Sequence, residues 1–165
     1  AAFASSLKRL NWHFDFRDLL NQPMLMRDHL EADRADMGSI QADDMIGQSA
    51  LLWRMIYRSV HSTIGLFPRF NIVRHEDLSL DPVTGYKSLY ESLGLTFTEK
   101  VEDIILNSSS SENPRERSQK RVHSVKLDSR ANLANWKKRL TSEEIARIRK
   151  MTESVSHLFY SDNEW

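Results

Sequence analysis

The chain has 165 residues, 40% of them hydrophobic, which is enough for one compact domain with an apolar core. Its 23 basic residues balance its 23 acidic ones, and a chain without net charge is not typical of proteins that bind nucleic acids or membrane surfaces. The absence of cysteine excludes disulfides and thiolate metal sites and fits a cytoplasmic protein, with the Golgi lumen left open. No apolar run reaches the ~20 residues that a membrane span needs.

The first residues, 1 to about 12, predict an amphipathic helix because their apolar residues recur at helical spacing. Ser5 and Ser6 stand near its amino end, where backbone N–H groups favour an anion; simple capping or solvent exposure is the alternative. The helical pattern begins at the first residue without a cap. We therefore expect the sequence to begin inside a helix, with an upstream portion absent.

The segments that follow are less regular. An aromatic stretch at 11–20 precedes a helical segment that Pro23 opens toward Leu30. The acidic segment 31–44 has a weak pattern and predicts a mobile loop or cap. Residues 45–64 form the clearest long helix, which we expect to cover one face of a sheet.

Residues 70–75 predict a strand of that sheet, because Phe70, Ile72 and Val73 form a short β-prone run. Asp81 and Pro82 are typical of an N-cap and first helical position, and Gly94 of a helix end. A strand, a short acidic turn and a helix in this order indicate an α/β fold.

The charge balance changes near the end of the chain. Residues 1–114 carry eleven basic and sixteen acidic side chains, whereas 115–139 carry nine basic and two acidic ones. This polar, basic segment is either a solvated flap or an anion-binding loop. A helix from about Thr98 precedes it, and a capping box at residues 141–144 opens a last helix after it.

Three segments together resemble the sulfotransferases that use 3′-phosphoadenosine 5′-phosphosulfate (PAPS). Residues 73–82, Val-Arg-His-Glu-Asp-Leu-Ser-Leu-Asp-Pro, followed by Leu93-Gly94-Leu95, are similar to the family's Y-E-D-L/M, D-P and F-L-G stretch. Residues 135–141, Asn-Trp-Lys-Lys-Arg-Leu-Thr, resemble G-D-W-K-N-x-F-T. Residues 1–7 resemble the end of R-x-P-x-x-x-x-x-S, with Ser6 at the serine.

The resemblance implies a three-layer α/β fold related to the P-loop kinases, mostly helical in this chain with at least one strand at about 70–75. Residues 1–165 would be the C-terminal part of a single sulfotransferase domain, without the N-terminal phosphosulfate-binding loop. The catalytic base would also lie in that absent portion, so its identity is unknown, and no residue cluster has metal-ligand spacing.

The family also implies cofactor-binding residues. Ser6 would donate to the 3′-phosphate of PAPS, and Arg130 would bind the same phosphate from the basic segment. Lys137 matches the lysine that follows the family's tryptophan, and the alternative is a solvent-exposed lysine without a binding role. His75 matches a tyrosine that lies near the adenine in the family, and the alternative is a histidine that only ends a strand. The family's first loop arginine is Ser129 here, so Arg121 or Lys126 is a substitute candidate.

These features predict a sulfotransferase that moves a sulfuryl group from PAPS to a hydroxyl or amine and leaves adenosine 3′,5′-bisphosphate (PAP). The acceptor is a small molecule, carbohydrate, lipid or protein, and this part of the chain alone would be inactive. Central to the hypothesis is that the basic segment ahead of Trp136 meets the first helix at the 3′-phosphate. Two rival hypotheses are a fragment of a P-loop nucleotide kinase, which would prefer ATP with magnesium, and a non-catalytic helical interaction module.

Overall fold

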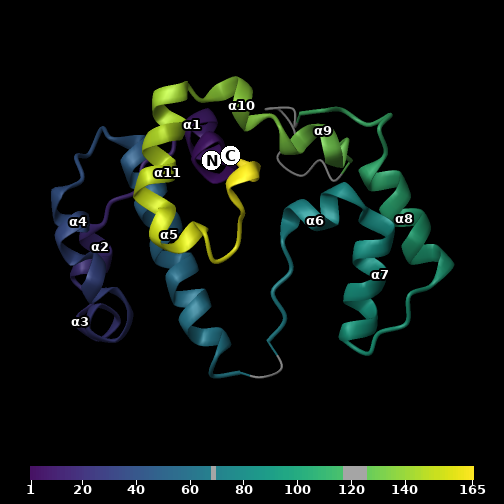
Figure 1. The fold of residues 1–165 in the computed structure, drawn as a ribbon, viewed down its shortest axis with the longest axis horizontal. Helices are drawn as coiled ribbons and strands as arrows, with labels where there is room; N and C mark the ends of the chain where they lie inside the picture. The colour runs from purple at the N-terminus through teal and green to yellow at the C-terminus, as the bar shows by residue number, and fades with distance from the viewer. Residues whose placement is uncertain (68–69, 117–125) are drawn as a thin grey trace. The chain divides into compact units, whose positions relative to one another are not determined.

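The computed structural model describes residues 1–67, 70–116 and 126–165. Within these ranges the chain is helical, and it divides into two compact units (Figure 1). The α5 unit comprises residues 1–70 and 136–165, and the α7 unit comprises residues 71–135.

The α5 unit contains ten helical elements in the described residues. These are α1 (Ala2–Leu10), α2 (Arg17–Leu20), α3 (Pro23–Leu25), the π-helix η1 (Met26–Leu30), the 3-10 helix η2 (Glu31–Asp33), α4 (Arg34–Ser39), α5 (Met45–Ile64), α10 (Trp136–Arg139), α11 (Ser142–Ser156) and the 3-10 helix η3 (Asp162–Glu164). Figure 1 shows α11 lying alongside α5, and α1 also packs against α5.

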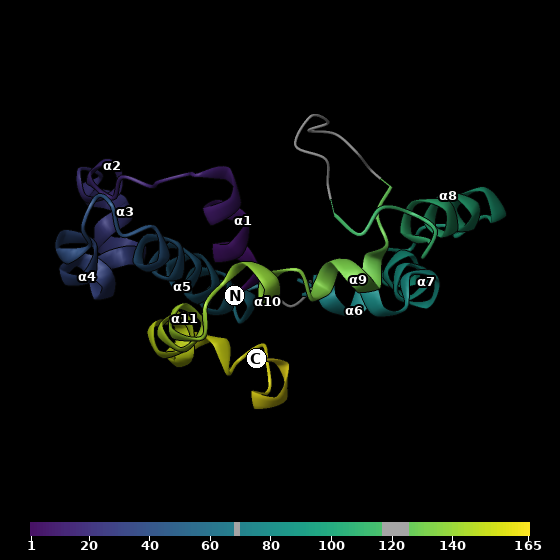
Figure 2. The ribbon, with the colours of Figure 1, turned by 90° about the horizontal axis from the view of Figure 1, so that it is seen from above.

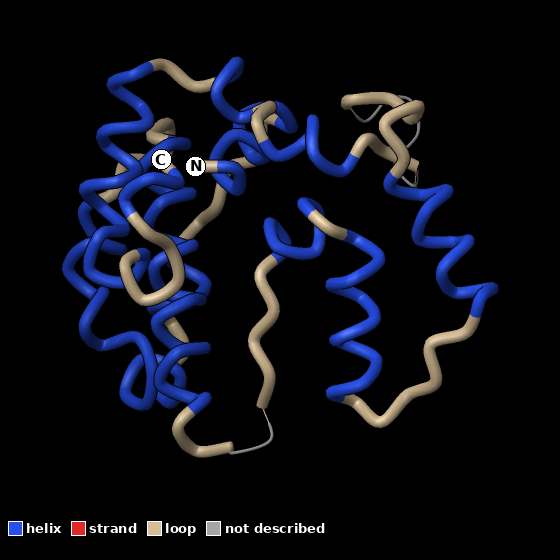
Figure 3. The backbone as a smooth tube through the Cα atoms, turned by 45° about the vertical axis from the view of Figure 1, so that its right-hand side comes forward, coloured by secondary structure: helices blue, strands red, loops and turns tan. Residues whose placement is uncertain are grey.

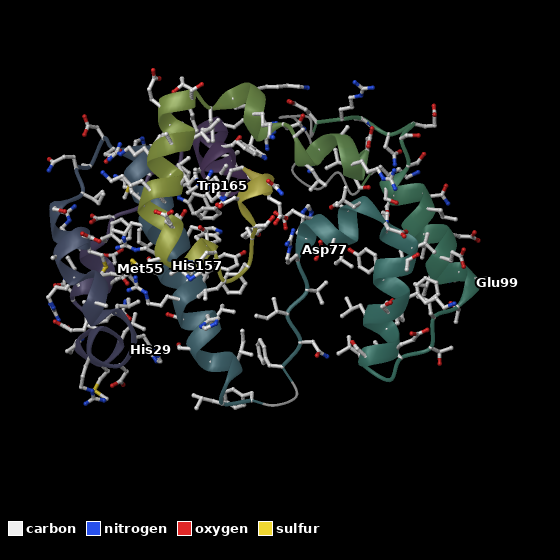
Figure 4. All side chains as sticks on the ribbon, in the orientation of Figure 1. His29, Met55, Asp77, Glu99, His157 and Trp165 are labelled. Atoms are coloured by element: carbon white, nitrogen blue, oxygen red, sulfur yellow. The ribbon has the colours of Figure 1, made fainter. Side chains whose placement is uncertain are left out.

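Two apolar clusters hold this unit together. In the first, the short helices between α1 and α5, gathered beside α5 in Figure 2, pack on Leu51 and Met55 of α5. In the second, Ala4 of α1 meets Ala50 of α5 and Ile148 of α11. Trp165, labelled with Met55 in Figure 4, packs against this second cluster. Helix α5 is therefore the common partner of the other helices in its unit.

The segment 31–44 is not the mobile loop that its composition predicts. It forms η2 and α4, and the fully buried carboxylate of Asp33 ties it to α5. The guanidinium of Arg54 donates to Asp33 at 2.7 Å and also pairs with Asp36, and that of Arg58 donates to Asp33 at 2.6 Å. Another N–H of Arg54 donates to the Met151 carbonyl at 3.2 Å, so the same network reaches α11.

The helix boundaries follow local signals closely. Asp44 caps α5 by accepting from the Gly47 N–H at 3.0 Å, and it also pairs with Arg147 of α11. The predicted capping box at α11 is confirmed, because Thr141 and Glu144 exchange both of its hydrogen bonds.

The carboxylate of Glu144 has a second partner, the ammonium of Lys8 on α1, at 2.7 Å. Lys8 also donates to the Arg139 carbonyl at 3.2 Å, so one ammonium joins α1 to the end of α10 and to the cap of α11. Burial alone would raise the pKa of Glu144, but the hydrogen bonds from Lys8 and from the Thr141 N–H outweigh it. The pKa of Glu144 is therefore below its ordinary value of 4.5.

The α7 unit consists of α6 (His75–Leu80), α7 (Pro82–Ser92), α8 (Glu99–Ser109) and α9 (Ser129–Leu133). Helix α7 packs against α6 and α8, and α9 packs against α6. The predicted cap of α7 is confirmed: Asp81 accepts from the Thr84 N–H, and Pro82 is the first helical residue. Gly94 follows the helix with a φ of 67°, which favours glycine.

The strand predicted at 70–75 is absent, and the prediction of an α/β fold is wrong. The described residues contain no strand, as the tube in Figure 3 shows. Residues 71–74 form an irregular connection, and His75 begins α6. The side chains of this stretch remain open to solvent, with Phe70, Ile72 and Val73 exposed to 54%, 42% and 42%. A β-prone run becomes a strand only when a neighbour satisfies its backbone groups, and the described helices offer none.

Helix α5 was predicted to cover a sheet. Its residue range is as predicted, but it packs on other helices instead.

Asp33→Asn should destabilise the protein strongly, since it leaves Arg54 and Arg58 facing a neutral buried amide. Losing one partner of a buried ion pair costs about 3–5 kcal/mol of the free energy of unfolding. Urea denaturation followed by circular dichroism measures this loss. Asp28→Asn, in an exposed pair with Arg27, is the matched control and should leave the midpoint nearly unchanged. Equal midpoints for the two variants would contradict the role of the Asp33 network.

The Lys8–Glu144 pair should make the free energy of unfolding depend on pH in the acidic range. Because the folded-state pKa of Glu144 is lowered, the pair contributes stability above the ordinary value of 4.5 and loses it as pH falls through the folded pKa. Lys8→Met should therefore show a shallower fall in the free energy of unfolding than wild type between about pH 6 and about pH 3. Lys100→Met, which changes an exposed lysine of α8, is the control. Identical acid profiles for wild type and Lys8→Met would disprove this account of the pair.

Candidate functional site

A group of cations gathers where α1 packs against α10 in the α5 unit. We call it the α1–α10 cation cluster: Lys8, Arg9, Lys137, Lys138 and Arg139. An acidic side chain, Glu144, contacts it through Lys8. The Lys137 and Lys138 side chains are exposed, whereas the other three are half-buried. Such a surface presents N–H donors and positive charge, which suits a phosphate or sulfate group.

Lys137, a residue predicted from the sequence, belongs to this cluster. Its ammonium lies 5.1 Å from the centre of the Trp136 ring. Trp136 is half-buried against the apolar cluster that contains Ala4 and Ile148, so its ring is held by packing. A cation over an aromatic face is attracted by the ring quadrupole, and this contact orients Lys137 without neutralising its charge.

Ser6, the second predicted residue of this unit, is exposed on α1. Its neighbour Ser5 is fully buried and accepts an N–H of Arg139 at 3.4 Å. The Ser5 N–H already donates to the Ala1 carbonyl, so Ser6 lies beyond the unpaired N–H groups of the first turn. Only the Ser6 hydroxyl, and not a helix amino end, is therefore available to an anion at this position.

Arg130 and His75 belong to the α7 unit, where they come from helices that pack together. Arg130, on α9, donates from its Nε to the Leu80 carbonyl at the end of α6, at 2.7 Å. His75 is the first residue of α6 rather than the end of a strand, and its exposed ring lies 3.5 Å from the Ser79 hydroxyl. The structure thus places Ser6 and Lys137 in the α5 unit, and Arg130 and His75 in the α7 unit.

Arg121 lies outside the described residues. The described chain on either side of it is joined by hydrogen bonds. The Asp128 N–H donates to the Pro114 carbonyl at 3.0 Å, and the Asn135 amide donates to the Arg115 carbonyl at 2.7 Å. Asn135 itself is buried, at 2% exposure, and the contact is part-buried. The basic segment also contains α9, which composition alone did not predict because it read as a polar loop.

Sequence reasoning missed several residues of these surfaces. Lys8, Arg9 and Arg139 were visible as basic residues, but only the packing of α1 on α10 brings them together. Ser5 was considered beside Ser6, and the structure buries Ser5 while Ser6 is exposed. In the described ranges, no group of three histidine or acidic residues is placed to hold a metal ion, and no helix is long and apolar enough to cross a membrane.

Comparison with known proteins gives two findings. The model of the sulfotransferase domain family matches residues 17–160. Carbohydrate sulfotransferase 1 of Danio rerio is 35% identical over 75 residues, which cover 46% of this chain and 17% of the relative. No solved structure matches the chain significantly. Because the family model covers most of its length, the chain belongs to the sulfotransferase family.

Proposed function

We propose that this protein is a sulfotransferase that moves a sulfuryl group from PAPS to a hydroxyl group of a carbohydrate and releases PAP. Membership of the family supports sulfuryl transfer, and the name of the Danio rerio relative supports a carbohydrate as acceptor. The structural observation that carries the proposal is the α1–α10 cation cluster, which contains the lysine of the tryptophan–lysine motif.

The residues of the cluster fit the phosphates of such a cofactor. PAPS would supply the activated sulfuryl group, and its phosphates need several cationic donors at one surface. The cluster brings five cationic side chains to one surface, although the whole chain carries no net charge. Arginine and lysine side chains donate without accepting, so they match phosphate oxygens, which only accept.

Each predicted residue has a distinct proposed role. The Lys137 ammonium, oriented by Trp136, would bind a phosphate oxygen as a point charge, and the Ser6 hydroxyl would donate a hydrogen bond. Arg130 would present the terminal nitrogens of its guanidinium to the 3′-phosphate, and Arg121 remains a candidate for the same phosphate. The exposed His75 ring would lie beside the adenine.

The test is a calorimetric titration of the full-length protein with PAP, with 5′-AMP, and with ATP plus magnesium. A 3′-phosphate site must bind PAP more tightly than 5′-AMP, which lacks that phosphate. Lys137→Ala should weaken PAP binding roughly tenfold, since one charge-assisted contact with a phosphate is lost. Lys87→Ala, at an exposed lysine of α7, is the matched control.

Two results would overturn the proposal. One is equal affinity for PAP and 5′-AMP, which would leave no role for a 3′-phosphate. The other is tighter binding of ATP with magnesium than of PAP, which would favour the chemistry of a nucleotide kinase.

A further inference from the structure

Two neighbouring side chains fasten α9 to the end of α6 in the α7 unit. The Ser129 hydroxyl donates to the Ser79 carbonyl at 2.8 Å, and the Arg130 Nε donates to the Leu80 carbonyl at 2.7 Å. Both carbonyls belong to the last turn of α6, where helix geometry leaves backbone acceptors without a partner along the helix. The two bonds therefore provide donors to two carbonyl groups that have no hydrogen-bond partner within α6.

The contact of Arg130 uses only one of its three nitrogens. In the part of the chain that the structure describes, its Nη1 and Nη2 make no hydrogen bond or ion pair, and the residue is exposed. Its Nε is held by the Leu80 carbonyl, and its terminal nitrogens have no hydrogen-bond partner among the described residues. An arginine restrained in this way loses less conformational freedom when it binds an anion than one that is free to rotate.

Ser129 restrains the backbone from which Arg130 projects. It is the first residue of α9, directly after Asp128, whose carboxylate caps the helix by accepting from the Ala131 N–H at 2.9 Å. Asp128 fixes the start of α9, and Ser129 fixes that start against α6. Without the Ser129 hydroxyl, one of these two side-chain bonds between α9 and α6 would be lost.

We infer that Ser129 is a positioning residue for Arg130 in binding the 3′-phosphate of the nucleotide. The inference rests on the proposed function. It assigns a role to Ser129, which stands where the family resemblance places an arginine. Ser129 does not touch the phosphate. It holds α9 on α6 so that the Arg130 guanidinium is already oriented when the phosphate arrives.

A double-mutant cycle on the full-length protein tests the inference, with PAP and 5′-AMP as ligands in calorimetric titrations. Ser129→Ala should weaken PAP binding roughly five- to tenfold, the effect of losing one orienting hydrogen bond, and leave 5′-AMP binding unchanged. Ser129→Thr keeps the hydroxyl and should restore PAP binding. In an Arg130→Ala background, Ser129→Ala should have no further effect, because the residue it positions is gone.

Ser92→Ala is the matched control, since the Ser92 hydroxyl also donates to a carbonyl at 2.8 Å, that of Leu89, and does not contact α9. Wild-type affinity for PAP in Ser129→Ala would overturn the inference. So would an equal loss from Ser129→Ala with and without Arg130, which indicates a general structural role. Failure of the wild-type protein to bind PAP is a different result: it removes the proposed function itself, and the inference with it.

Discussion

The ion pair between Lys8 and Glu144 is the contact on which the cationic surface of the α5 unit depends. Its two residues are 136 positions apart in the sequence, and the ammonium also donates to the Arg139 carbonyl. The pair therefore brings the last turn of α1, the end of α10 and the first turn of α11 to one place. Five cations in such proximity repel one another, and the Glu144 carboxylate offsets part of that repulsion.

Glu144 can pair with Lys8 and also cap α11, because both roles need the same orientation of its carboxylate. As the third residue of α11 it completes the capping box, and the bond from the Thr141 N–H fixes its carboxylate toward the helix start. The Lys8 ammonium then meets a carboxylate that is already held. The carboxylate that caps α11 locally thus also contacts a residue that is distant in the sequence. This contact holds α1 beside α10 in the α1–α10 cation cluster.

The features that could be predicted from the sequence are those set by neighbours along the chain. The N-caps of α7 and α11 and the glycine after α7 depend on residues three or four positions apart, and the structure has them as predicted. The prediction of a strand at 70–75 was wrong because strand formation does not depend on neighbours along the chain alone. Its β-prone residues were recognised correctly, but a strand needs a partner that local sequence does not reveal.

The acidic side chains of residues 31–44 were misinterpreted for the same reason, because their partners are distant in the sequence. The acidic segment 31–44 looked mobile because its partners, Arg54 and Arg58, lie more than 20 positions away from Asp33. Of the candidate site, the sequence indicated Lys137 and Arg130 through the family resemblance. It did not indicate the contacts that orient them, which are the ring of Trp136 and the carbonyl of Leu80. Those contacts depend on tertiary packing.

The most direct test of the central claim is a crystal structure of the full-length protein with PAP bound. The account predicts that phosphate oxygens of PAP lie within hydrogen-bonding distance of at least one side chain of the α1–α10 cation cluster, with the Lys8–Glu144 pair intact. A structure in which PAP binds with no phosphate oxygen near this cluster would contradict it.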